Sequence, residues 1–164
     1  MGALITLLDT ILFIYFLGIS IVVPTLDAQI VLPSNIFPDV LVHLNMWYIN
    51  EFGNYLVSEK PHFFVGITWQ ELVFAWPLCI ASLYGIVAGK TWLPTICLIY
   101  GVDFLTALVA ILSELVGSGK ASDKLISLYS IFVGFAVLAV LRGLLPHFQK
   151  PNVTRPALVK KKDS

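Results

Sequence analysis

Four long runs of apolar residues, separated by short polar segments, dominate the chain. They lie at about residues 4–26, 61–89, 91–113 and 125–145. Each run can cross a hydrocarbon core of roughly 30 Å, which needs a helix of about 20 apolar residues. A helix is also the single-segment structure that satisfies its own backbone hydrogen bonds in lipid. The pattern therefore predicts an all-α polytopic membrane protein, a bundle of four transmembrane helices.

The polar segment before the second run has a helical pattern of its own. Pro33 and Pro38 break the segment into turns, and Asp39 is a candidate N-cap for a helix that begins there. Apolar and aromatic residues then recur at near-helical spacing, at Leu41, Leu44, Trp47, Tyr48 and Phe52. We expect a short helix across the outer mouth of the bundle. The alternative is an ordinary interfacial aromatic belt, with Trp47 and Tyr48 at headgroup level.

Composition agrees with a membrane protein and excludes a water-soluble globule. Of the 164 residues, 58% are hydrophobic and 12% are charged, and the mean hydropathy is +0.88. Ten basic and ten acidic residues cancel, so there is no basic surface of the kind that binds nucleic acid. We expect one four-helix domain over residues 1–148 and a basic cytosolic tail over residues 149–164.

The distribution of basic residues predicts the orientation, because Lys and Arg favour cytoplasmic segments. The absence of Lys and Arg before the first run favours a retained helix over a cleaved signal peptide. An even number of spans puts both termini on one side. That side carries seven basic residues and the opposite side three, which predicts cytosolic termini. The seven are Lys90, Arg142, Lys150, Arg155, Lys160, Lys161 and Lys162, and the three are Lys60, Lys120 and Lys124.

Lys161 and Lys162 also stand four and three positions from the carboxyl end, as in dilysine signals for retrieval to the endoplasmic reticulum. We expect an endoplasmic-reticulum membrane protein on this ground. The alternative interpretation is a basic juxtamembrane tail that is attracted to anionic lipid.

Glu71, Asp27 and Asp103 lie in or at the ends of apolar runs, where ionisable groups are costly and normally face the bundle interior. Glu71 forms a helical stripe with Thr68, Phe74 and Ala75, and Pro77 is expected to bend the helix beside it. A bend beside a buried acid favours a cavity there.

The other two acids have simpler alternative roles. Asp27 ends the first run, where it could serve as a ligand site or merely end the helix. Asp103 shares a helical face with Tyr100 and Thr106. The alternative to ligand binding is that Asp103 is a neutral carboxylic acid, hydrogen-bonded to a neighbouring hydroxyl.

The sequence shows no catalytic triad, phosphate-binding glycine loop or metal-spaced Cys/His set. Cys79 and Cys97 lie in apolar runs and are expected to behave as small hydrophobic residues. We therefore expect no catalytic residues, no metal and no cofactor.

Several stretches, in order from about residue 3 to 145, resemble the sigma-2 receptor family within the EXPERA group, which also contains the emopamil-binding sterol isomerase. The most specific are Trp47-Tyr48-Ile49-Asn50-Glu51-Phe52 and Glu71-Leu72-Val73-Phe74 with Pro77. The residue choices are closer to a plant-type member than to a mammalian one. The remaining matches are Asp27-Ala28-Gln29, Leu32-Pro33, Ile99-Tyr100, Thr106, Ile111-Leu112-Ser113 and Lys120-Ala121-Ser122.

The resemblance implies a lipid-opening pocket in which Asp27 and Glu71 meet, one holding a ligand amine and the other, protonated, bracing it. Sterols or oxysterols, cationic amphiphilic amines and membrane lipid are the implied partners. A homodimer and a sterol-transport membrane protein are further implied partners, and sterol homeostasis or trafficking is the implied process. The predicted ligand-binding residues are Asp27, Glu71, Asp103, Tyr100, Thr106, Tyr129, Gln29 and Trp47.

Two residues depart from the animal pattern: Asn54 replaces an acid and Asp103 replaces a histidine. Asn54 predicts a less anionic pocket. The first alternative function is a sterol Δ8-Δ7 isomerase, in which Glu71, Asp27 and Asp103 would move protons. The resemblance favours a binding protein, because the isomerase type also has a His-plus-Glu arrangement that the four runs lack. The second alternative is a structural scaffold in which the acids serve helix packing alone.

Overall fold

The structure, a computed structural model, describes residues 2–145. Within these residues the regular elements are helices, and four helical rods are long and apolar enough to cross a membrane. The all-α, four-span prediction is therefore confirmed, and the protein is a multi-pass membrane protein. The rods span Gly2–Val31, His62–Val87, Leu93–Ser118 and Asp123–Leu144.

The first two rods are each interrupted by one π-helical turn. In the first rod, Pro24 lies inside the turn, and in the second, Pro77 follows the turn closely. A proline offers no backbone N–H and so disturbs the regular α-helical ladder. The first rod consists of α1 (Gly2–Val22), η1 (Val23–Asp27) and α2 (Ala28–Val31), and the second of α5 (His62–Gln70), η3 (Glu71–Ala75) and α6 (Trp76–Val87).

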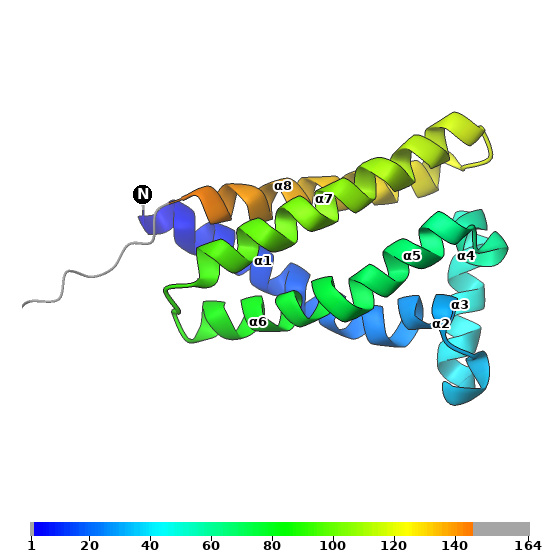
Figure 1. Cartoon of the computed structure of the whole chain (residues 1–164), viewed down its shortest axis with the longest axis horizontal. Coiled ribbons are helices and arrows are strands. Elements are labelled where there is room, and N and C mark those ends of the chain that lie inside the picture. The colour runs from blue at the N-terminus through cyan, green and yellow to red at the C-terminus, as the bar shows by residue number, and fades with distance from the viewer. Residues whose placement is uncertain (1, 146–164) are drawn as a thin grey trace, which may run out of the picture.

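The other two rods, α7 (Leu93–Ser118) and α8 (Asp123–Leu144), form a long antiparallel hairpin (Figure 1). Ser122 caps α8, because its side chain accepts a hydrogen bond from the Leu125 backbone N–H at 3.2 Å. Two glycines let the rods approach closely. A Cβ at Gly101 would lie 2.7 Å from the Val140 nitrogen, and one at Gly143 would lie 2.5 Å from the Leu98 Cβ.

The outer segment folds into a cap across one end of the bundle. It contains η2 (Ser34–Ile36), α3 (Asp39–Phe52) and α4 (Tyr55–Glu59), and α3 runs across the ends of the long rods (Figure 1). The predicted outer helix is present, but the prediction that Asp39 is its N-cap was wrong. Pro38 is the cap, because its extended backbone turns its carbonyl oxygen to the Leu41 and Val42 N–H groups.

Polar contacts fasten the cap to the α7–α8 hairpin, among them two salt bridges and a hydrogen bond at the tip of the hairpin. Glu51 pairs with Lys124 at 2.8 Å and Glu59 with Lys120 at 3.2 Å. The Ser122 hydroxyl donates to the Phe52 carbonyl oxygen at 2.7 Å. The cap therefore covers the bundle end at which α7 turns into α8.

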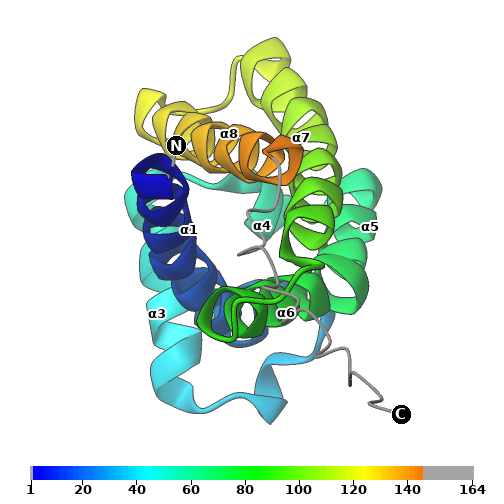
Figure 2. The same ribbon diagram turned by 90° about the vertical axis from the view of Figure 1, so that its left-hand side faces the viewer.

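The N-terminal end of α1 and the end of α8 lie together at the opposite end of the bundle, beside the α6–α7 connection (Figures 1 and 2). This arrangement is the one that an even number of spans requires. Packing inside the bundle divides into two clusters. One surrounds Phe16 and Tyr100 near the termini, and the other surrounds Leu56 and Leu125 near the cap.

Candidate functional site

A cavity of about 310 Å³ lies inside the bundle and takes its walls from both interrupted rods, the α7–α8 hairpin and α3. Its volume falls within the range of roughly 300–1,000 Å³ typical of small-molecule sites. Most of the lining is apolar, which suits a hydrophobic ligand. The aromatic residues of the lining are Tyr48, Phe52, Phe64, Phe104, Tyr129 and Phe132.

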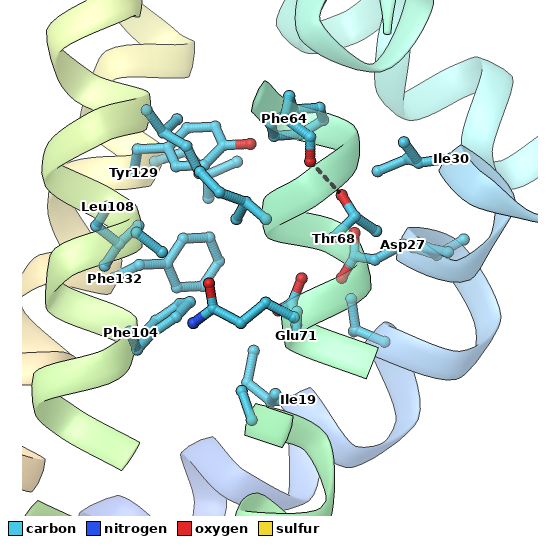
Figure 3. Close-up of a pocket in the computed structure, with 18 of the residues that line it drawn as sticks. Ile19, Asp27, Ile30, Phe64, Thr68, Glu71, Phe104, Leu108, Tyr129 and Phe132 are labelled. Atoms are coloured by element: carbon cyan, nitrogen blue, oxygen red, sulfur yellow. Dashed lines mark hydrogen bonds between the residues drawn. The ribbon is translucent and has the colours of Figure 1, made fainter. Parts of the chain in front are cut away.

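Asp27 and Glu71 face this cavity together (Figure 3). Asp27 is the last residue of the π-helical turn η1, and Glu71 is the first residue of η3. The two turns contact each other, so two separate rods bring their acids to one wall. Single π-helical turns inside α-helices occur frequently at functional sites. The sequence analysis expected the second rod to bend at Pro77. In the structure, the π-helical turn of this rod begins at Glu71.

Neither acid is neutralised by a basic side chain within residues 2–145. The salt bridges of this part of the chain join Lys120 to Glu59, Lys124 to Glu51 and Arg142 to Asp9. Both carboxyl groups therefore remain free to meet a ligand.

Thr68 stands beside the acids in the close-up (Figure 3). Its hydroxyl donates to the Phe64 carbonyl oxygen at 2.9 Å, one turn earlier in α5. Because that proton is already used, the Thr68 oxygen is left as an acceptor. It can accept a hydrogen bond from a protonated carboxyl group or from a ligand hydroxyl.

Two tyrosines, Tyr48 and Tyr129, add hydroxyl groups to the cavity wall, and Asn54, which does not line the cavity, holds them by hydrogen bonds. Asn54 is fully buried, and its amide nitrogen donates to the Tyr48 hydroxyl at 3.0 Å and to the Tyr129 hydroxyl at 3.5 Å. Burial raises the pKa of Tyr48 above its usual 10.0, while the Asn54 hydrogen bond lowers it and nearby Asp27 raises it. Tyr48 is therefore a neutral hydroxyl at physiological pH.

The structure brings Asp27, Glu71, Asp103 and Tyr129 to the cavity from the predicted ligand-binding set. Asp103 lies at the edge of the cavity, where its carboxylate accepts a hydrogen bond from the Gln70 amide. Thr106 lines a separate outer groove that Asp103 also borders.

The other three predicted residues lie elsewhere. Tyr100 is buried in the packing cluster near the termini, where its hydroxyl bonds that of Tyr15 at 2.9 Å. Gln29 is buried beneath the cap, and its amide donates to the Thr25 and Leu41 carbonyl oxygens at 2.7 and 3.2 Å. Trp47 is 59% exposed on α3. The predicted retrieval residues Lys161 and Lys162 lie outside the described residues.

Sequence reasoning missed Gln70 and the two phenylalanines Phe104 and Phe132. Gln70 carried a usable signal, because it is an uncharged polar residue in the middle of an apolar run, next to Glu71. Phe104 and Phe132 are indistinguishable in sequence from residues that merely pack. In the structure their rings meet edge to face, 6.3 Å apart, and Phe132 meets Tyr129 in the same way.

The site suits recognition of an amphiphile. It offers carboxyl and hydroxyl groups at the edge of an apolar space, so one cationic or hydroxyl group can be held while the rest of the ligand contacts hydrocarbon and aromatic surface. Among residues 2–145, no group of three or more His, Cys, Asp or Glu is arranged to hold a metal.

Comparison with known proteins gives one family. The family model described as EXPERA (EXPanded EBP superfamily) matches residues 40–143. Sigma intracellular receptor 2 of Macaca fascicularis is 35% identical over 106 residues, and that of Homo sapiens is 34% identical over 106 residues. Each of these alignments covers 64% of this chain and 60% of the relative. The protein of the same name from Xenopus tropicalis is 26% identical over 145 residues, which cover 82% of this chain and 85% of the relative.

The chain thus spans about 60% of the length of the macaque and human relatives that it matches. The matched region of the family model begins in α3 and ends in α8. It includes Glu71 and Tyr129, whereas Asp27 precedes it.

Proposed function

The chain belongs to the EXPERA superfamily, and from this premise we propose that it is a sigma-2-receptor-like protein of the endoplasmic-reticulum membrane. In this proposal, sterols or oxysterols and cationic amphiphilic amines bind in the acid-lined cavity, and this binding affects sterol homeostasis or trafficking. The relatives named Sigma intracellular receptor 2 support a receptor of this kind.

The observation that carries the proposal is the meeting of Asp27 and Glu71 in one largely apolar cavity. Two carboxyl groups that share a dry space cannot both ionise cheaply, so one keeps its proton while the other carries the charge. A ligand ammonium would pair with the charged group. The protonated group would donate a hydrogen bond, and Thr68 offers an acceptor beside it.

A neutral sterol would use the same cavity differently. Its ring system would contact the aromatic wall, and its single hydroxyl would bond a carboxyl group or the Tyr48 or Tyr129 hydroxyl. Loss of a carboxylate charge therefore removes the main attraction for an amine but only one of several hydrogen-bond partners for a sterol.

The decisive experiment compares these two ligand classes on purified protein in mild detergent. Asp27→Asn should weaken binding of a cationic amphiphilic amine by about 10- to 100-fold, the range of a lost charge-assisted hydrogen bond. Binding of a neutral sterol should change far less. Asp39→Asn is the matched control, because it makes the same substitution at an exposed position in the cap. Equal small effects of both substitutions on both ligands would contradict the proposal.

Identification of the lipid that co-purifies with the protein provides an independent test. A sterol or oxysterol is the expected finding. Incubation with a Δ8-sterol then separates binding from isomerisation, since a binding protein returns the sterol unchanged. A shifted double bond would replace the receptor assignment by that of an isomerase.

Location, orientation and assembly belong to the same proposal. Fluorescent fusions should coincide with an endoplasmic-reticulum marker. A protease added to sealed vesicles should remove a tag at either terminus, because both termini are expected to face the cytosol. The protein is also proposed to form a homodimer, and the mass of the detergent-solubilised protein should then correspond to two chains.

A further inference from the structure

A second hollow, an outer groove of about 620 Å³, lies along the seam between the second rod and α7. Phe74, Ile99 and Val102 on its walls are each 41–52% exposed. They belong to membrane-spanning helices, so the groove opens toward lipid. It shares four residues with the inner cavity, namely Ile67, Gln70, Asp103 and Ala107. The two hollows are therefore neighbours that one thin wall separates.

The polar part of this wall is the Gln70–Asp103 pair. The Gln70 amide donates to the Asp103 carboxylate, and within residues 2–145 this is the one side-chain hydrogen bond between α5 and α7. α5 and α7 are otherwise loosely joined, whereas α7 packs mainly on α8 and, within the second rod, on α6. A single polar bridge thus closes the boundary between groove and cavity.

The route to the cavity from the outer end of the bundle is closed more firmly than the groove. The cap covers the outer end of the bundle, and two salt bridges and the Ser122–Phe52 hydrogen bond hold it to the α7–α8 hairpin. An amphiphile dissolved in the bilayer reaches the groove without passing the cap.

We propose that the α5–α7 seam is the lateral entrance to the cavity, that the outer groove is a first binding site for the arriving amphiphile, and that the Gln70–Asp103 hydrogen bond is the latch between them. The inference rests on the proposed function, since it concerns the route of that same ligand.

The chemistry of the latch selects the ligand. In lipid, no water replaces a broken hydrogen bond, so Gln70 and Asp103 hold each other until another polar group competes. An ammonium or hydroxyl group in the groove can bond the Asp103 carboxylate and release Gln70. An alkane chain offers no such partner and leaves the latch closed. The polar group then has Glu71, the neighbour of Gln70 in sequence, as its next partner inside the cavity.

The test locks the seam reversibly. In the double variant Gln70→Cys with Asp103→Cys, a short cleavable thiol-reactive cross-linker joins α5 to α7, and cleavage or omission of the linker gives the open reference state of the same protein. The native Cys79 and Cys97 are both fully buried, so they do not compete for the reagent. A thiol count by mass spectrometry establishes that the link has formed.

We expect the lock to slow association and dissociation of a radiolabelled cationic amphiphile by about tenfold or more, with a much smaller change in Kd, because a gate changes rates and leaves the bound state intact. Gln70→Ala, which removes the latch, should raise both rates. Glu51→Cys with Lys124→Cys is the matched control, since it locks the cap to α8 in the same way and should leave both rates unchanged.

Three outcomes separate the two proposals. Unchanged rates in the locked seam, with normal binding, would overturn the entrance while leaving the proposed function intact. Slowing by the cap lock alone would also overturn it and place the route under the cap. Absence of amine binding to the unmodified protein would overturn the proposed function itself, and the route with it.

Discussion

Arg142 and Asp9 form an ion pair that joins the last span to the first. Arg142 Nε donates to Asp9 Oδ1 at 2.5 Å, and Nη2 donates to Oδ2 at 3.2 Å, so the guanidinium binds the carboxylate in a bidentate geometry. Arg142 is only 3% exposed, and its remaining nitrogen, Nη1, has no hydrogen-bond partner among the described residues. At the bundle end opposite the cap, this pair thus combines a buried guanidinium with a partly exposed carboxylate.

The first prediction removes one partner of this pair. Asp9→Asn leaves the Arg142 cation buried without a counter-charge, which should lower the free energy of unfolding by about 3 kcal/mol. Thermal unfolding in detergent measures the loss. Arg142→Met combined with Asp9→Asn should recover much of it, because the uncompensated charge is then gone. A single variant as stable as the unmodified protein would show that the pair contributes nothing to the fold.

The second prediction concerns the closeness of α7 and α8. A Cβ at Gly101 would lie 2.7 Å from the backbone nitrogen of Val140, and backbone cannot move aside as a flexible side chain can. Gly101→Ala should therefore destabilise the protein by about 1–3 kcal/mol, the usual cost of overpacking.

Gly117→Ala is the matched control for Gly101→Ala. It lies in the same helix, and a Cβ there meets nothing within 4 Å. The better helix propensity of alanine should make this variant neutral or slightly more stable. Parallel unfolding curves of the two variants compare them directly, and equal effects would argue against the tight helix contact.

The third prediction uses pH. The hydrogen bond and the charge of Lys124 hold the pKa of Glu51 below its usual value of 4.5. A depressed pKa means that the pair stabilises the fold above the usual pKa and that this contribution is lost as pH falls through the lowered value. The midpoint of thermal unfolding should therefore fall slightly on acidification for this reason.

Glu51→Gln tests this assignment, because it cannot ionise. It should be slightly less stable than the unmodified protein at pH 7, and the difference should vanish at a pH below the lowered pKa of Glu51. A difference of the same size at both pH values would show that the Glu51 charge is not the cause. Lys124→Met removes the partner and should remove the same pH dependence.

The spans are predictable because the length and polarity of a run are local properties of the chain, and a buried acid stands out at any position within it. The direction in which a side chain points is not a local property of the chain, because it depends on the exact helical geometry around it. Regular helical spacing groups Phe74 with Thr68 and Glu71, but Phe74 lies within the π-helical turn η3, in which the rotation per residue differs from that of an α-helix. Phe74 consequently lines the outer groove rather than the cavity.

Asn54 shows a second limit of sequence reasoning. Its replacement of an acid indicated a role in the charge of the pocket, and the structure places it outside the cavity lining, where it donates hydrogen bonds to Tyr48 and Tyr129. The contact with Tyr129 joins residues 75 positions apart in the chain. No local pattern reveals such a pairing, because it depends on how the cap settles on the hairpin.

The fourth prediction distinguishes the roles of the two cavity acids. Glu71→Gln keeps the shape of the side chain and a hydrogen-bond donor, and therefore mimics a protonated carboxyl group. If Glu71 is the protonated partner and Asp27 the charged one, Glu71→Gln should weaken amine binding clearly less than Asp27→Asn, whose expected loss is about 10- to 100-fold. Competition binding of one radiolabelled amine to both variants measures the difference.

Two further variants make this comparison independent of packing. Glu71→Leu removes the donor while keeping an apolar side chain, so it should weaken amine binding more than Glu71→Gln does. The double variant Asp27→Asn with Glu71→Gln carries no charge on either acid and should bind the amine no better than Asp27→Asn alone, while a neutral sterol still binds. A larger loss from Glu71→Gln than from Asp27→Asn would reverse the assignment and make Glu71 the partner of the ammonium. Equal losses would mean that the two carboxyl groups share the charge, with the proton moving between them as the ligand binds.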